Sequence, residues 1–147
     1  MRIYLPLTPA DRPVLERSGS DVELVAGRAA WAVTAEARAS FPQGDEEDLE
    51  YEALQEATHV ALGEVAAASR ALVIALDVPE RDLASAEDGG AYGIAAVRAT
   101  NGRIASFHVT ELSAAAAEAD DTDPALLWFD AAEGPRALEY LAGGTPD

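Results

Sequence analysis

Three residues whose side chains could hold a metal ion are spaced about one helical turn apart in this 147-residue chain. Glu52, Glu56 and His59 are separated by four and three positions, so in a helix they share one face. Carboxylate oxygens and an imidazole nitrogen suit Zn, Mn or Fe. The chain has no second Glu-x-x-His sequence, and a helical wheel puts these three residues opposite the apolar face. The pattern favours a solvated helix face, with a metal site as the alternative.

Four polar residues on two predicted strands form a second candidate site. Arg2 and Tyr4 alternate with apolar residues near the N-terminus, and Ser106 and His108 share one face of a later strand. If the two strands are neighbours, these side chains would form a polar patch on the open face of the sheet. Such a patch could bind an anion or transfer protons. Unrelated surface positions are the alternative, since no carboxylate is identifiable to complete a catalytic triad.

Aromatic residues beside acidic ones suggest a contact surface. Tyr51 lies with Glu47 in the acidic run GDEEDLEYEALQEATH, and Trp128 and Phe129 follow two leucines near the C-terminus. Aromatic anchors on a polar surface are typical of protein interfaces. The alternative for Tyr51 is partial burial under a loop. The alternative for Trp128 and Phe129 is the core or a subunit interface.

The elements that must position these residues follow from periodicity and capping. Asp45 caps a long amphipathic helix that we expect to extend to about Ser69. The apolar run at 71–78 predicts a central strand, and the Asn101-Gly102 pair predicts the turn of a hairpin. Residues 125–130 fit either an edge strand or the start of a helix.

The remaining segments complete one domain. We expect an N-terminal strand, a short helix after Thr8, one or two strands ending near Thr34, a short alanine helix and a terminal helix. This order predicts a single α+β domain over residues 1–143, followed by a frayed tail at 144–147. Its sheet would be mixed or antiparallel, with four to six strands and helices mainly on one face. A ferredoxin-like sandwich is favoured.

Composition excludes several classes of function. The chain has no cysteine, which excludes disulfides, thiolate metal sites and a cysteine nucleophile. Its first residues lack an apolar core long enough for a signal peptide, and it has no apolar run long enough to cross a membrane, so we expect a cytoplasmic protein without membrane contact. Its net charge of −17 argues against direct nucleic-acid binding. The same charge leaves open an acidic surface that mimics nucleic acid.

Several short motifs carry a resemblance to known sequences. MRIYLP at the start, GDEEDLEYEAL in the middle, DVP after the central strand and LLWFD near the end resemble an uncharacterised family of small actinobacterial proteins. Phe129 stands where that family typically has tyrosine. The resemblance implies an actinobacterial source and a single domain, and it implies no activity, cofactor or catalytic residue.

The sequence thus favours a non-enzymatic acidic domain, without a cofactor, that binds an unknown protein partner or forms a homo-oligomer. One alternative is a small enzyme that uses the Glu52, Glu56 and His59 metal site or acid/base chemistry at Tyr4 and His108. The other is a nucleic-acid mimic.

Overall fold

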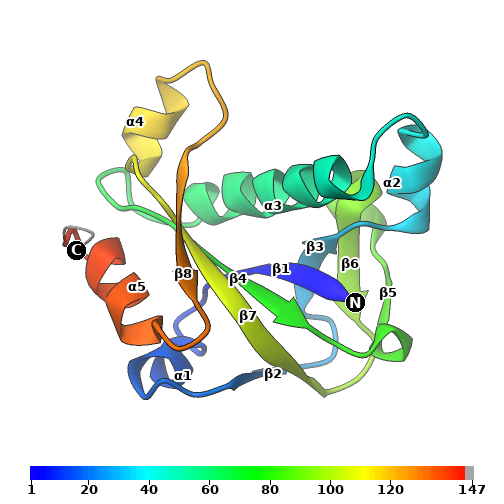
Figure 1. The fold of residues 1–147 in the computed structure, drawn as a ribbon, viewed down its shortest axis with the longest axis horizontal. Coiled ribbons are helices and arrows are strands. Elements are labelled where there is room, and N and C mark those ends of the chain that lie inside the picture. The colour runs from blue at the N-terminus through cyan, green and yellow to red at the C-terminus, as the bar shows by residue number, and fades with distance from the viewer. Residues whose placement is uncertain (145–147) are drawn as a thin grey trace.

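The computed structural model describes residues 1–144, which form one curled, eight-stranded sheet with five α-helices around it (Figure 1). The strands are β1 (Arg2–Pro6), β2 (Asp21–Leu24), β3 (Ala29–Ala32), β4 (Leu72–Asp77), β5 (Leu83–Ser85), β6 (Gly93–Ala96), β7 (Thr100–Thr110) and β8 (Leu126–Asp130). The helices are α1 (Arg12–Glu16), α2 (Ala35–Ser40), α3 (Glu46–Gly63), α4 (Ala114–Glu118) and α5 (Gly134–Leu141). Two 3₁₀ segments, η1 (Glu80–Asp82) and η2 (Glu87–Tyr92), precede β5 and β6.

The strand order is β2-β7-β4-β1-β3-β6-β5, and β8 pairs with β7 beyond the end of β2. Every pair is antiparallel, and the sheet curls into a half-barrel. The expected sheet of four to six strands and the ferredoxin-like sandwich are therefore wrong. Three of the strands, β2, β5 and β8, are short edge strands. Their pairing depends on contacts with other segments, so local sequence patterns underestimate the number of strands.

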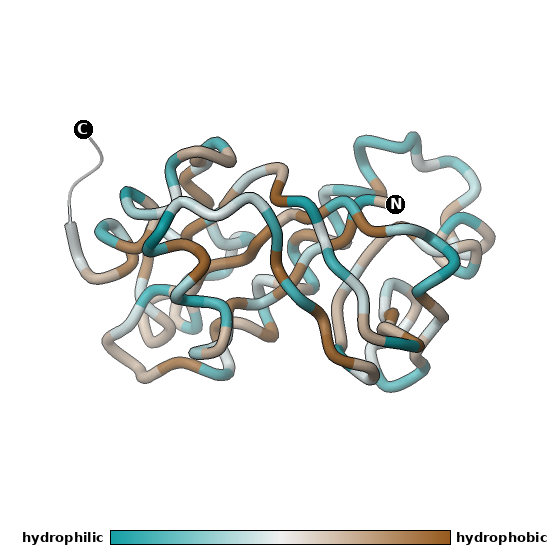
Figure 2. Tube along the Cα trace, turned by 90° about the horizontal axis from the view of Figure 1, so that it is seen from below, coloured by the Kyte–Doolittle hydropathy of each residue, from teal (hydrophilic) through white to brown (hydrophobic). Residues whose placement is uncertain are grey.

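Helices cover both faces of the sheet, which corrects the expectation of one covered face. One core lies on the side of α1 and α5 and includes Ile3, Leu5, Ile74 and Phe107. The other lies under α3 and includes Val73 and a series of alanines. Figure 2 shows hydrophobic segments running through the interior and hydrophilic segments on the outer loops. Strands β1 and β4 are buried on both faces because they lie in the middle of the sheet.

Helix α3 begins where the sequence predicts. The Asp45 carboxylate accepts a hydrogen bond from the Asp48 backbone N–H at 2.9 Å, which caps the first turn. Its sheet-facing side carries Leu49, Ala53, Ala57 and Ala61, all buried at four-residue spacing. The small alanines let the helix lie close to β1, β3 and β4. The helix ends at Gly63, earlier than the predicted Ser69.

The predicted Asn101-Gly102 turn is wrong, because both residues lie inside β7. β6 pairs with β3 and β5 instead of β7. A Cβ on Gly102 would lie 2.9 Å from the Leu76 side chain, so the glycine allows close packing here. A bulge next to Ala105 then moves Ile104 onto the face of Phe107. Strict alternation along β7 would instead place Ile104 on the face of Ser106 and His108.

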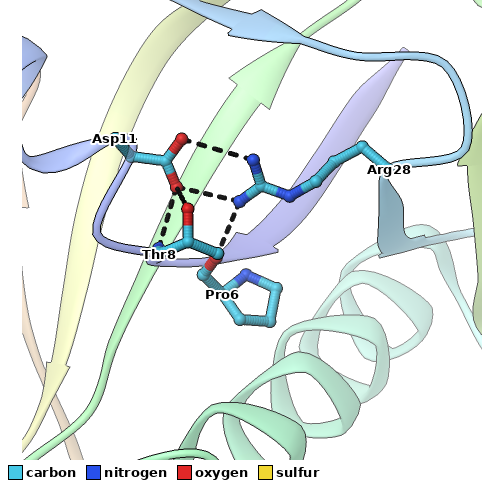
Figure 3. A network of polar contacts seen from close by, with 4 residues as sticks. All are labelled: Pro6, Thr8, Asp11 and Arg28. Carbon is cyan, nitrogen blue, oxygen red and sulfur yellow. Dashed lines mark hydrogen bonds and ion pairs between the residues drawn. The ribbon is translucent and has the colours of Figure 1, made fainter.

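A buried ion pair ties the turn after β1 to the start of β3 (Figure 3). Asp11 is 3% exposed and accepts hydrogen bonds from the Thr8 backbone N–H at 2.9 Å and hydroxyl at 3.0 Å. Arg28 donates from Nη2 to Asp11 at 2.8 Å and to the Pro6 carbonyl at 3.1 Å. The donors to this carboxylate come from Thr8 in the same turn and from Arg28 just before β3, so the ion pair joins two segments of the fold.

Hydrogen bonds from Arg70 anchor the C-terminal helix, α5, and the residues after it up to Gly144. Arg70 donates to the carbonyls of Tyr140 at 2.6 Å and Gly144 at 3.3 Å, and its guanidinium lies 4.0 Å from the Tyr140 ring centroid. Gly144, predicted to belong to a frayed tail, is thus hydrogen-bonded, and the rest of that tail, 145–147, lies outside the described residues. Within 1–144, none of the helices combines the length and the apolarity that a membrane crossing requires.

Candidate functional site

The sheet brings together the four residues of the predicted polar patch. β4 lies between β1 and β7, and its Ala75 pairs with Tyr4 on one side and Ser106 on the other. The Ser106 hydroxyl and His108 Nε2 are 2.9 Å apart and share a hydrogen bond. Arg2 donates from Nε to the Asp77 carboxylate at 2.7 Å. The strand pairing therefore gathers side chains that lie far apart in the sequence.

Three of these four side chains are buried or partly buried and Arg2 alone is exposed, which corrects the expected open face. Tyr4 and Ser106 are each 6% exposed, because they lie on the face that α3 covers. Burial and, to a smaller extent, the positive charge of Arg2 together lower the pKa of His108 to about 4. Burial, then the carboxylate of Glu50, raises the pKa of Tyr4 to about 12. Near neutral pH the imidazole and the phenol are thus both uncharged, as expected of a buried polar contact.

The three predicted metal ligands do not converge. Glu52 and Glu56 line one surface cavity with Tyr92, whereas His59 lines another with Pro124. No group of three or more histidine, aspartate or glutamate side chains within residues 1–144 is placed to hold a metal ion. The helical spacing of the three residues is as predicted. Glu118 and Asp120 also line the cavity of His59, but they do not form a metal-binding group with it.

The predicted contact residues fall into exposed and buried groups. Trp128 is 59% exposed and Tyr51 is 46% exposed, and Glu47 is also on the surface. Phe129 is only 5% exposed and packs against Tyr140 with ring centroids 6.0 Å apart. Successive residues of a strand point to opposite faces, so Phe129 enters the core while Trp128 leaves it. Phe129 is therefore not part of a surface.

The exposed aromatics flank the chain segment that leads into β8. The Tyr51 hydroxyl donates to the Asp123 carboxylate at 3.1 Å. Trp128 pairs with His108, which in turn pairs with Val73, so its side chain lies on the α3 side of the sheet. This surface, which we call the β8 edge, comprises Leu126, Trp128 and the backbone between them.

The outer edge of β8 carries free backbone groups. The Glu111 N–H donates to the Ala125 carbonyl at 3.0 Å, and antiparallel pairing alternates from there. Leu127 and Phe129 therefore direct their N–H and C=O groups to β7, whereas Leu126 and Trp128 direct theirs away from it. Among residues 1–144, β7 is the only strand that pairs with β8. A second strand could thus add to this edge.

One pair of neighbouring aromatic side chains was not predicted from the sequence. Phe41, after α2, and Tyr92, at the end of η2, lie with ring centroids 6.3 Å apart and planes 17° apart. The Thr34 hydroxyl donates to the Ala91 carbonyl and so holds the end of η2 against the start of α2. The exposed acids of α3 were visible in the sequence. Nothing local indicated that they would lie beside these two rings.

The fold and these surfaces define a class: an acidic domain built on one curled antiparallel sheet, with an open edge strand that carries an exposed tryptophan. The chain belongs to a family of unknown function, DUF6912, whose model matches residues 1–138. No curated protein and no solved structure matches it. The match covers all eight strands and most of α5.

Proposed function

We propose that this chain is a non-enzymatic binding domain that takes up an extended, basic segment of a partner protein along the β8 edge. The observation that carries the proposal is Trp128, which is 59% exposed on a strand with one open side. Large aromatic side chains often dominate the binding energy of protein interfaces. An exposed tryptophan also costs solvation free energy in the unbound protein, which a partner would recover.

The backbone supports strand addition over a short stretch. Leu126 and Trp128 each offer one N–H and one C=O to an incoming strand, which is the pattern used in β-augmentation. Beyond them, the Asp130 N–H is already bonded to the Glu133 carboxylate at 3.0 Å. The incoming segment would therefore pair with about three residues and gain most of its affinity from contact with the tryptophan ring.

Charge favours a basic partner over a second copy of this chain. Exposed carboxylates surround the edge: Glu111, Asp121, Asp123 and Asp130. Two copies, each with a net charge of −17, would bring like charges together. A segment rich in lysine or arginine would gain attraction at the same positions. Binding should therefore weaken as salt screens these charges.

The test is a display selection of random nine-residue peptides on the intact protein, followed by fluorescence anisotropy with the selected peptides. Trp128→Ala removes roughly 100–150 Å² of contact area, or about 2–4 kcal/mol, and should weaken binding at least about 30-fold. Leu126→Pro should also abolish binding, because it removes an outward N–H while the bonds to β7 remain.

The controls separate this edge from general stickiness. Trp128→Phe should retain much of the affinity. Glu87→Gln, a charge change in η2 near the opposite edge of the sheet, should change it little. All variants should unfold near the wild-type midpoint, since Trp128 and the control glutamate are exposed and the Leu126 N–H points away from β7. Peptides that bind Trp128→Ala as well as wild type would contradict the proposal. So would a dimer in light scattering that dissociates in Trp128→Ala, because it would identify a second copy as the occupant.

A further inference from the structure

A second surface, on the other flank of α3, combines aromatic rings with carboxylates. A groove of about 640 Å³ runs between α3 and the segment after α2, and its lining includes Phe41, Pro42, Leu49 and Tyr92. Phe41 is 51% exposed, and its ring stacks nearly parallel to that of Tyr92. An apolar floor with an accessible ring is suited to a flat, weakly hydrated ligand group.

Three acids of α3 border this groove. Asp48, Glu52 and Glu56 recur every four residues, so they form one stripe along the helix. None of the three has an ion-pair partner among residues 1–144. Like charges at this spacing destabilise a helix by about 0.2–0.5 kcal/mol per pair. The stripe therefore weakens α3 and attracts a cation from outside the chain.

The hydroxyl of Tyr92 is an independent sign of a missing partner. The side chain is 6% exposed, and its Oη is buried without a hydrogen-bond partner in the described part of the chain. Leaving such a group unpaired costs about 1–3 kcal/mol. Burial raises the pKa of Tyr92, and the negative charges of Glu52 and Glu56 raise it further. The neutral hydroxyl thus remains available at the floor of the groove, beside two carboxylates.

We propose that this groove binds the guanidinium group of an arginine side chain on a partner protein. The planar cation would stack on Phe41, donate hydrogen bonds to Glu52 and Glu56, and donate another to Tyr92 Oη after a small outward rotation of the Phe41 ring. Arginine fits better than lysine because it is flat, stacks on rings and has five N–H donors. The site lies apart from the β8 edge and does not depend on it.

The test uses three fluorescent peptides that are identical except for one central residue: arginine, lysine or the neutral isostere citrulline. Their dissociation constants for the intact protein would be measured by anisotropy, and the bound surface mapped by NMR. The arginine peptide should bind at least fivefold more tightly than the lysine peptide, and the citrulline peptide should show no saturable binding. Equal affinity for arginine and citrulline would overturn the proposal.

Matched variants identify the groups involved. Glu52→Gln with Glu56→Gln should weaken arginine-peptide binding at least tenfold. Glu16→Gln with Glu139→Gln makes the same charge change on α1 and α5 and should weaken it less than twofold. Equal losses in the two double variants would overturn the proposal, because they would show attraction by net charge alone.

Two ring variants test the aromatic part. Phe41→Leu keeps an apolar side chain but removes the π face, and should weaken binding severalfold. Tyr92→Phe should weaken binding without lowering the unfolding midpoint, because it removes a hydroxyl that has no hydrogen-bond partner among residues 1–144 of the free protein. Unchanged affinity in both variants would overturn the assignment. Trp128→Ala should leave arginine-peptide binding intact, so failure at this groove and failure at the β8 edge are distinguishable.

Discussion

The partly buried imidazole of His108 should make stability fall as the solution is acidified. Its pKa is lowered from 6.5 to about 4 in the folded protein, chiefly by burial. In the unfolded chain the imidazole binds a proton near pH 6.5, whereas the folded protein resists protonation down to about pH 4. The free energy that favours folding is therefore complete above pH 6.5 and is lost as the pH falls from 6.5 to 4.

The expected loss of unfolding free energy follows from the size of the His108 pKa shift. A difference of one pKa unit corresponds to about 1.4 kcal/mol, so a shift of this size corresponds to about 3 kcal/mol. Acidification also protonates many carboxylates, so the wild-type curve alone does not isolate His108. His108→Gln keeps a polar side chain of similar size that does not titrate. We expect the free energy of unfolding of wild type, relative to this variant, to fall by about 3 kcal/mol between pH 7.5 and pH 4.

The assay is urea unfolding of each protein at several pH values, followed by tryptophan fluorescence. The chain has only two histidines, so His59→Gln is a matched control. His59 is exposed, and its replacement should leave the pH dependence parallel to wild type. Histidine NMR signals provide a direct second measurement. A constant wild-type minus His108→Gln difference across this range, or a His108 midpoint within about half a unit of 6.5, would refute the burial argument.

Two further predictions concern packing. Asp11→Ala should lower the free energy of unfolding by about 3–5 kcal/mol, because it leaves the Arg28 charge without its buried partner. Urea titrations at pH 7 would measure this loss. A loss below about 1 kcal/mol would show that the ion pair contributes no more than an exposed one. Gly134→Ala should cost about 1–3 kcal/mol in thermal unfolding, since its Cβ would lie 2.6 Å from the Leu15 carbonyl oxygen where α5 meets α1. Gly63→Ala, whose Cβ would meet nothing within 4 Å, is its control, and equal losses in both would contradict the clash.

Local chemistry in the sequence was sufficient to predict several elements. The Asp45 side chain caps α3 because its carboxylate reaches the N–H of Asp48, and both residues are close in the chain. The apolar run that became β4 was predicted as a central strand, and β4 does lie between β1 and β7. Residues 126–130 form a strand, which was one of the two structures that their pattern allowed.

Other features depended on which segments became neighbours. Asn101-Gly102 has the residue types of a turn, yet it pairs with β2 because long-range contacts outweigh a local preference. The alternation in β1 correctly separated Tyr4 from Ile3, but it did not reveal that α3 would cover the Tyr4 face. An alternating pattern identifies two faces, while burial depends on what packs against each of them.

The sequence by itself therefore determined the capped acidic helix, the central strand, the strong negative charge and the absence of cysteine chemistry, all of which arise from neighbouring residues or from composition. Only the tertiary structure decided that Phe129 is buried while Trp128 is exposed, because that depends on the contact of Phe129 with Tyr140. It also placed Phe41 and Tyr92 beside the acids of α3. These residues come from separate segments, and only the folded sheet brings those segments together.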